Sequence, residues 1–312
     1  MKLAAPFPYF GGKARVAAHV WARFGDVQNY VEPFFGSGAV LLARPSPPKT
    51  ETVNDLDGMV ANFWRAVQAE PETVARYADW PVSELDLEAR HRWLVGRKPE
   101  LVQAVRTDPA YYEAKAAGWW VYGMSLWIGG DWCRKDVASS MTQVPDLKSG
   151  ARGVHSALRG VSTCAEATAI IHGRMAALAD RLRRVRVCCG DWSRICGPTP
   201  TYHAGTPCGV FLDPPYGAER YGVYNEDSYE VAGDVRAWCL EQGKDSRLRI
   251  ALCGYDGEHN ELEEAGWSKF AWKANGGYAN RGTGNGAGNA KRERIWFSPH
   301  CLQPVQSPLD LE

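Results

Sequence analysis

Residues 29–38 read Asn29-Tyr30-Val31-Glu32-Pro33-Phe34-Phe35-Gly36-Ser37-Gly38, and this stretch decides the fold. Its apolar start predicts a strand, and its Gly-Ser-Gly end predicts a turn into a helix. Similar short runs follow and most end in Gly, Pro or Asp; they cover residues 51–55, 185–190, 209–213, 248–253 and 292–298. Segments with helical spacing lie between them, at 13–24, 57–69, 163–184 and 229–242. This alternation predicts an α/β fold with a doubly wound, mainly parallel sheet.

The middle of the chain has a different pattern. Residues 59–160 contain no convincing strand, and three segments there read as helices: 86–95, 99–106 and 111–127. We therefore expect a core domain made of residues 1–58 and 161–312, interrupted by a helical insertion at 59–160. The Gly- and Asn-rich residues 275–289 predict a mobile loop.

Composition is that of a folded soluble protein. Apolar residues make up 45% of the 312 residues, and 36 basic residues balance 36 acidic ones. Because no apolar run approaches the roughly 20 residues that span a bilayer, and no signal peptide is visible, we expect a cytoplasmic protein without membrane contact. Nine Cys without a CxxC spacing predict reduced thiols and no metal site.

Charge is unevenly distributed along the chain. Residues 51–88 hold nine acidic and two basic residues, residues 148–186 hold two acidic and eight basic ones, and residues 269–294 hold one acidic and six basic ones. The two basic stretches, Arg152–Arg186 and Lys269–Arg294, are candidate contacts for nucleic-acid phosphates.

The turn that follows the first strand predicts a nucleoside site. Gly36 and Gly38 let the backbone approach a ligand closely, and Asp55, 19 residues after Gly36, ends the next strand at the distance expected for a ribose acceptor. Phe34 precedes the glycines and suits an aromatic, uncharged ligand better than a phosphate. Before the first helix, Tyr9 and Lys13 are candidates for a lid over the same ligand.

A second motif, Phe211-Leu212-Asp213-Pro214-Pro215-Tyr216, follows a strand that should be buried. The two prolines fix the backbone, so the Asp213 carboxylate and the Pro214 carbonyl become two acceptors at one strand tip. Such a pair suits methyl transfer to a planar amine like the N6 of adenine, because two acceptors draw the nitrogen toward tetrahedral geometry and stabilise its developing charge. Tyr216 offers a face for base stacking.

Taken in order, the segments Tyr9-Phe10-Gly11-Gly12-Lys13, Glu32–Gly38, Asn54-Asp55 and Asp213–Tyr216 resemble the Dam-type (alpha-class) DNA adenine-N6 methyltransferases of bacteria and phages. The resemblance covers roughly residues 1–58 and 185–298. It implies a Rossmann-like methyltransferase sheet with a helical target-recognition domain inserted at 59–160, S-adenosyl-L-methionine as cofactor, and double-stranded DNA from which the target adenine is flipped.

The resemblance also assigns roles to residues. It implies that the target adenine is held by Asp213, Pro214, Pro215 and Tyr216. It implies that the cofactor is bound by Tyr9, Lys13, Glu32, Phe34, Gly36, Gly38, Asp55, Asp191 and Asp213, with Asp191 beside the cofactor's adenine.

Several alternatives stay open at this point. The same acceptor geometry suits the N4 of cytosine, an RNA base or a protein amide, and a non-catalytic DNA-binding regulator would keep the fold without the reaction. The DNA recognition sequence, a preference for hemimethylated sites, a functional pairing with a restriction endonuclease and the oligomeric state are not determined by the sequence.

Overall fold

The computed structural model describes residues 3–9, 12–127, 132–133, 153–154, 163–216, 230–272 and 292–303. Within these ranges one sheet holds seven strands, in the order β3-β2-β1-β4-β5-β7-β6. The strands are β1 (Asn29–Glu32), β2 (Thr50–Asp55), β3 (Val185–Cys189), β4 (Cys208–Leu212), β5 (Leu248–Tyr255), β6 (Ser268–Ala271) and β7 (Glu293–Phe297). Strands β1 to β5 are parallel to one another, and β7 runs antiparallel to both β5 and β6. The predicted α/β fold is confirmed.

The strand order reverses between β1 and β4. These two strands are adjacent and parallel, with Val31 opposite Val210, and the chain proceeds outward from them in both directions. In open α/β sheets, ligands bind at the carboxyl ends of the strands where the order reverses. The two motifs of the sequence follow β1 and β4, so the fold brings them to this point.

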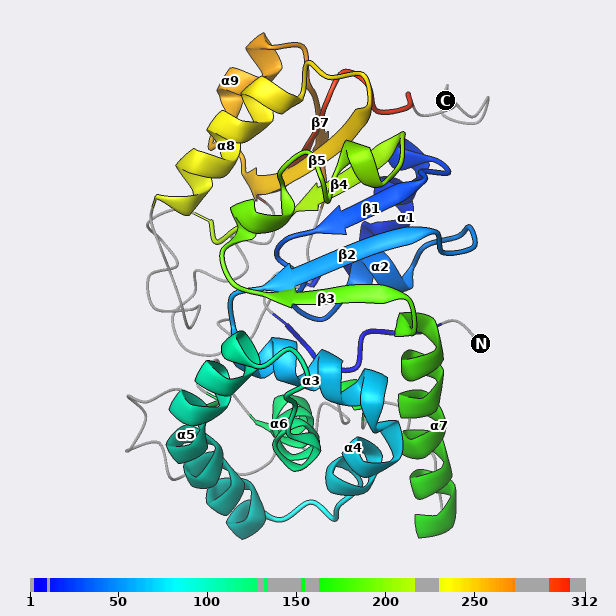
Figure 1. Cartoon of the computed structure of the whole chain (residues 1–312), viewed down its shortest axis with the longest axis vertical. Coiled ribbons are helices and arrows are strands. Elements are labelled where there is room, and N and C mark those ends of the chain that lie inside the picture. The colour runs from blue at the N-terminus through cyan, green and yellow to red at the C-terminus, as the bar shows by residue number, and fades with distance from the viewer. Residues whose placement is uncertain are drawn as a thin grey trace.

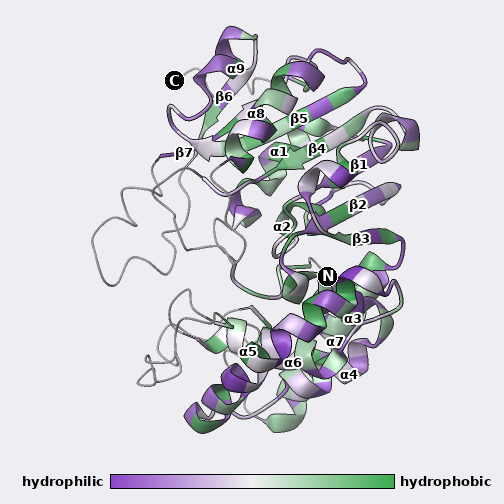
Figure 2. Cartoon of the chain, turned by 60° about the vertical axis from the view of Figure 1, so that its left-hand side comes forward, coloured by the Kyte–Doolittle hydropathy of each residue, from purple (hydrophilic) through white to green (hydrophobic). Residues whose placement is uncertain are grey.

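Helices cover both faces of the sheet. Helices α1 (Ala17–Phe24) and α2 (Ala39–Leu42) lie behind it in Figure 1, and α8 (Val231–Gln242) lies in front, with α9 (Asn260–Glu264) close to α8. Val210 and Leu212 on β4 pack with α8 residues, whereas Phe211 between them joins the core on the other side. Both faces of β4 are therefore buried, which explains its mainly hydrophobic colour in Figure 2.

Five further helices gather beyond β3, at the bottom of Figure 1. They are α3 (Gly58–Ala69), α4 (Pro71–Ala78), α5 (Glu84–Thr107), α6 (Ala114–Leu126) and α7 (Cys164–Leu182). Asp57 caps α3 by accepting from the Met59 amide, and Thr163 with Glu166 forms a capping box on α7. Helix α7 comes after the expected insertion in sequence but packs against α3 and α4.

The helical part departs from expectation in α5. Residues 86–95 and 99–106 were expected as two helices, but they form one helix with Pro99 inside it. Pro99 removes one backbone donor. The buried residues Leu87, Leu94 and Leu101 recur every seven positions across it, so one continuous face packs against α3 and α6. The sequence also gave no indication of α4 or β6.

An aromatic cluster joins the N-terminal segment to the helices. Phe7 packs edge-on against Phe63 of α3 and Trp120 of α6, at centroid distances of 5.3 and 4.8 Å. Such pairs contribute about 0.5–1.5 kcal/mol each beyond the area they bury. The cluster fixes the approach of residues 3–9 to the sheet.

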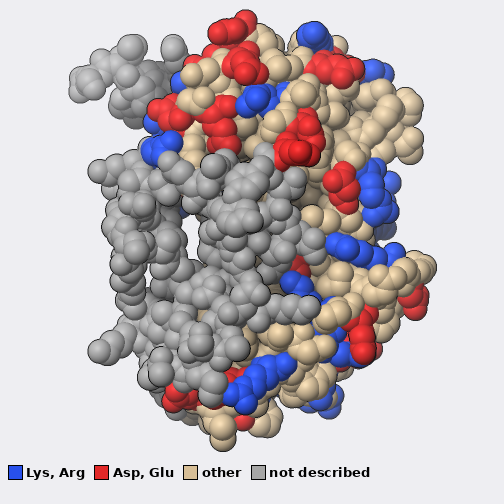
Figure 3. All heavy atoms as spheres, turned by 90° about the vertical axis from the view of Figure 1, so that its left-hand side faces the viewer, with Lys and Arg blue, Asp and Glu red and all other residues tan. Residues whose placement is uncertain are grey.

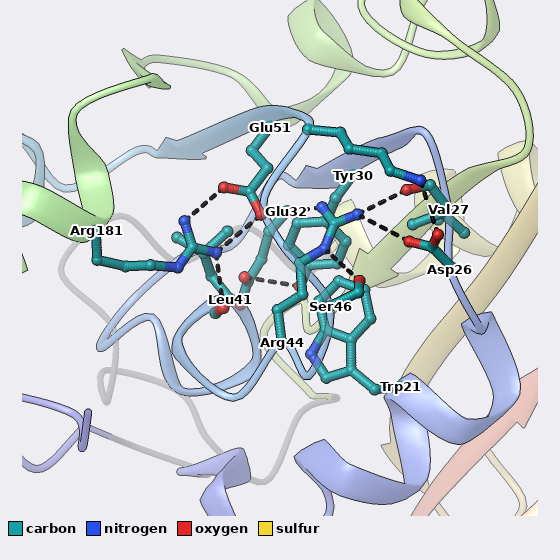
Figure 4. A network of polar contacts seen from close by, with 12 residues as sticks. Trp21, Asp26, Val27, Tyr30, Glu32, Leu41, Arg44, Ser46, Glu51 and Arg181 are labelled. Atoms are coloured by element: carbon teal, nitrogen blue, oxygen red, sulfur yellow. Dashed lines mark hydrogen bonds and ion pairs between the residues drawn. The ribbon is translucent and has the colours of Figure 1, made fainter. Parts of the chain in front are cut away.

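A buried ionic network connects α7 to the sheet (Figure 4). Arg181 donates to both oxygens of Glu51 on β2, at 2.6 and 2.8 Å, and Arg44 donates to the same carboxylate at 3.0 Å. The Arg44 guanidinium also lies over the ring of Trp21. Since Glu51 and Arg44 side chains are each 1% exposed, these charges depend on one another.

Among the described residues, no helix is long and apolar enough to cross a membrane.

Candidate active site

A cleft opens at the carboxyl ends of the parallel strands. Its lining combines the turn after β1, the end of β2, the turn after β3 and the residues after β4. It includes the predicted site residues Tyr9, Lys13, Glu32, Phe34, Gly36, Asp55, Asp191, Asp213 and Pro215. Gly38, Pro214 and Tyr216 lie outside this lining. The fold thus places most of the two predicted sites around one cavity.

The turn after β1 requires both of its glycines. Gly36 has φ +47° and Gly38 has φ +68°, in the region that L side chains rarely adopt. A Cβ on Gly36 would lie 2.5 Å from the ring of Tyr9, and one on Gly38 would lie 2.8 Å from the ring of Phe35. Gly36 therefore lets Tyr9 close over the turn, and Gly38 allows tight packing behind it.

Asp55 closes this turn from the end of β2. One carboxylate oxygen accepts from the Gly36 amide at 2.8 Å, and the other accepts from the Asp57 amide at 2.9 Å. Burial, with the nearby Asp57 carboxylate, raises the pKa of Asp55 to about 7. The carboxyl group thus lines the cleft in a fixed position and changes its charge near neutral pH.

Asn54, which the sequence analysis did not assign, ties three strand ends together. Its side-chain amide donates to the carbonyl of Pro33 at 3.0 Å and to that of Gly190 at 2.9 Å. These carbonyls follow β1 and β3, on either side of β2. The sequence places Asn54 directly before Asp55, but it does not show that β1 and β3 lie on either side of β2. The role of Asn54 in joining these strand ends could therefore not be predicted.

One wall of the cleft is aromatic. Phe34 stacks on Trp192 with ring centroids 6.3 Å apart and planes 25° apart. Trp192 opens the 3-10 helix η3 (Trp192–Ile195), and Asp191 caps that helix by accepting from the Ser193 amide at 2.9 Å. Asp191 lines the cleft as expected, but its carboxylate is engaged in this cap. The sequence analysis missed Trp192.

Asp213 lies at the tip of β4 with both oxygens engaged. Lys13 forms an ion pair with one oxygen at 2.9 Å, and the hydroxyl of Tyr216 donates to the other at 2.6 Å. The Lys13 ammonium also lies 3.6 Å from a carboxylate oxygen of Glu293, the first residue of β7. Each carboxylate oxygen has two lone pairs, so Asp213 retains capacity to accept from a ligand.

Tyr216 has its ring inside the protein in this structure. It is 2% exposed and packs edge-on against Tyr255, with centroids 4.9 Å apart. Burial, with the charge of Asp213, raises the pKa of Tyr216 well above its usual value, so its hydroxyl remains a donor to Asp213. Its role as a stacking platform for a base stays a prediction.

Glu32 is a buried carboxyl group at the base of the cleft. It is 2% exposed and accepts from the Tyr30 hydroxyl at 2.8 Å. Burial raises the pKa of Glu32 well above its usual value. A cationic ligand group reaching Glu32 would lower this pKa and favour the ionised carboxylate.

Several members of the basic stretches make internal contacts. Arg174 donates to the carbonyls of Gly153 and Val154, Arg181 binds Glu51, and Lys269 and Arg294 both pair with Asp256. Figure 3 shows acidic side chains near the top of the face it presents, intermixed with basic ones. These four side chains stabilise the fold, and phosphate contacts from the remaining basic residues stay a prediction.

The comparison with protein families gives one match. The model of the D12 class N6 adenine-specific DNA methyltransferases matches residues 9–90, which include the Tyr9 segment, the turn after β1 and the end of β2. The Asp213–Tyr216 motif lies beyond the matched residues. A search among curated proteins found no match.

Proposed function

We propose that the chain is an N6 adenine-specific DNA methyltransferase, as the match of residues 9–90 to the D12 class indicates. Its methyl donor is S-adenosylmethionine, and its acceptor is an adenine flipped out of double-stranded DNA. One observation carries the proposal. The turn closed by Asp55 and the acceptor Asp213 line the same cleft, so a nucleoside cofactor and a target amine would meet there.

The residues of the cleft fit this cofactor. The face of Phe34 beside Trp192 suits its adenine ring, and Asp55 suits its ribose hydroxyls. The buried Glu32 suits its ammonium group, because a nearby cation stabilises the ionised carboxylate that burial disfavours. When bound, S-adenosylmethionine supplies a methyl group already activated by its sulfonium.

Asp213 and the carbonyl of Pro214 hold and orient the target amine. The two acceptors bind the two N6–H groups, turn the nitrogen lone pair toward the methyl donor and stabilise the positive charge that develops on nitrogen. Lys13 and Tyr216 each contact one oxygen of the Asp213 carboxylate, so the orientation of this carboxylate is set before the base arrives. No residue has to act as a nucleophile in this scheme.

Methyl transfer to a base of a DNA duplex requires that base to leave the stack. Unpairing and unstacking cost a few kcal/mol, which contacts in the cleft offset. The helices α3–α6, within the proposed recognition insert at 59–160, flank the sheet on the β3 side and would bind the duplex beside the cleft. A cytoplasmic location and a pairing with a restriction endonuclease also remain predictions.

The test is methyl transfer to unmethylated DNA, followed by digestion to nucleosides and mass spectrometry. We expect N6-methyl-2′-deoxyadenosine from the wild type. With Asp213→Ala we expect at least about a hundredfold slower transfer, since one acceptor of the amine is lost, while cofactor binding measured by calorimetry persists. Methylcytosine would overturn the choice of base, and wild-type turnover by Asp213→Ala would overturn the role of Asp213.

A further inference from the structure

We propose that Glu293 is a positioning residue for methyl transfer, acting through Lys13 to keep the Asp213 carboxylate free to accept the target amine. The inference rests on the proposed function above and adds a residue to its machinery. Neither the sequence motifs nor the family match, which ends at residue 90, assigns a role to Glu293.

The ammonium of Lys13 lies between two carboxylates. It is 2.9 Å from Asp213 and 3.6 Å from Glu293, and the side chains of Lys13 and Glu293 are 4% and 3% exposed. The rings of Tyr216 and Trp272 flank it, with centroids 5.3 and 5.7 Å away. Water therefore solvates this cation little, and its position depends on the two carboxylates.

Strand direction explains why Glu293 reaches the site. Because β7 runs antiparallel to β5, its first residue lies where β5 ends, and Glu293 is opposite Tyr255. The carboxyl ends of β4 and β5 form the same edge of the sheet. A residue near the end of the chain thus comes to lie beside Lys13, which precedes the first strand.

Sharing one cation between two carboxylates changes the electrostatics of the site. With Glu293 present, the three groups carry a net charge of minus one, which favours the positive charge developing on the amine. Without Glu293, Lys13 neutralises Asp213 by itself and competes with the amine for its oxygens. Glu293 thereby preserves the strength of Asp213 as an acceptor.

The charged form of Lys13 depends on the same two carboxylates. Burial alone would lower the pKa of Lys13, but Asp213 and Glu293 raise it above its usual value. Among the described residues, Cys253 and Tyr216 also face this cluster, and burial raises their pKa values so that they stay neutral. Glu32 lies near Asp213, and burial raises the pKa of Glu32 as well. Loss of Glu293 leaves one carboxylate to oppose burial, so Lys13 should lose its proton at lower pH.

The first experiment compares Glu293→Gln with the wild type. We expect kcat to fall by about tenfold or more, with the KM for DNA and the Kd for cofactor within about threefold, since the carboxylate acts on the transition state. We also expect the alkaline limb of the kcat profile to move to lower pH. The matched control is Glu263→Gln, which removes a surface carboxylate paired with Lys269 on the same side of the fold. Its kcat and pH profile should equal those of the wild type.

A second readout needs no cofactor. The side-chain resonance of Lys13 in protein with isotope-labelled lysine, assigned by its loss in Lys13→Met, should titrate at lower pH in Glu293→Gln than in the wild type. An unchanged titration together with unchanged kcat would overturn the inference. It would leave the proposed function intact, because that function is tested separately and fails only if the wild type forms no N6-methyl-2′-deoxyadenosine.

A double-mutant cycle covers the case in which Glu293→Gln is poorly folded. In a Lys13→Met background, adding Glu293→Gln should not lower kcat further, because the ammonium through which Glu293 acts is already absent. Equal losses of kcat from Glu293→Gln in both backgrounds would show that Glu293 does not act through Lys13.

Discussion

Replacing Gly36 by Ala tests whether the turn after β1 holds Tyr9 over the cofactor site. The φ of +47° costs a residue with a Cβ about 1–2 kcal/mol. The new methyl group would also start 2.5 Å from the Tyr9 ring. Carbon atoms pack at about 3.5–4.0 Å, so the ring has to move by roughly 1 Å. Because Tyr9 lines the cleft, this shift changes the cofactor site itself.

We expect the Kd for S-adenosylmethionine to rise by about tenfold or more, equivalent to about 1.4 kcal/mol, when measured by calorimetry. The unfolding temperature should fall by about 2–4 °C for each kcal/mol of backbone strain. In a Tyr9→Ala background the steric part disappears and the strain remains, so Gly36→Ala should then change the Kd less.

Gly96→Ala is the matched control for this substitution. Gly96 lies in α5, and a Cβ there would have no heavy atom within 4 Å. Helix propensity predicts that this change stabilises the protein by up to about 1 kcal/mol without affecting cofactor binding. If Gly36→Ala bound the cofactor as tightly as Gly96→Ala does, the assignment of the turn to the cofactor site would be refuted.

Three further predictions concern the cofactor and the buried charges. Phe34→Ala should weaken cofactor binding by about 1–3 kcal/mol in calorimetry through lost stacking, and unchanged affinity would place the adenine elsewhere. Arg181→Met leaves Glu51 with one cation fewer and should lower the free energy of unfolding, measured in urea, by about 3–5 kcal/mol. As a control, Arg183→Met replaces an exposed side chain and should change this free energy by less than about 0.5 kcal/mol. Equal losses from the two substitutions would contradict a buried network. Burial raises the pKa of Asp55 from 3.8 to about 7, so ionisation of Asp55 lowers the stability of the fold as pH rises between these values. Below about pH 7 the Asp55 carboxyl group is protonated, and its proton competes with the ribose hydroxyls of the cofactor for the carboxylate oxygens. Cofactor affinity should therefore rise with pH up to about 7, and this dependence should disappear in Asp55→Asn.

The local sequence was sufficient to predict those parts of the structure that depend on residues close together in the chain. The apolar or β-branched runs predicted six of the strands, because residues of these types are enriched in strands. The spacing between Gly36 and Asp55 predicted a shared site, and the structure places an amide–carboxylate hydrogen bond between them. By contrast, Pro99 indicated a break in α5 that helix packing overrides.

The sequence by itself determined the class of fold and the two motifs that face the cleft, because each motif is a strand followed by a turn whose residue types have local physical causes. Only the tertiary structure decided which distant groups complete the site. Strand order places Gly190 beside Asn54, and the antiparallel return of β7 brings Glu293 to Lys13. Strand order and direction follow from the packing of the whole sheet, which no single segment encodes.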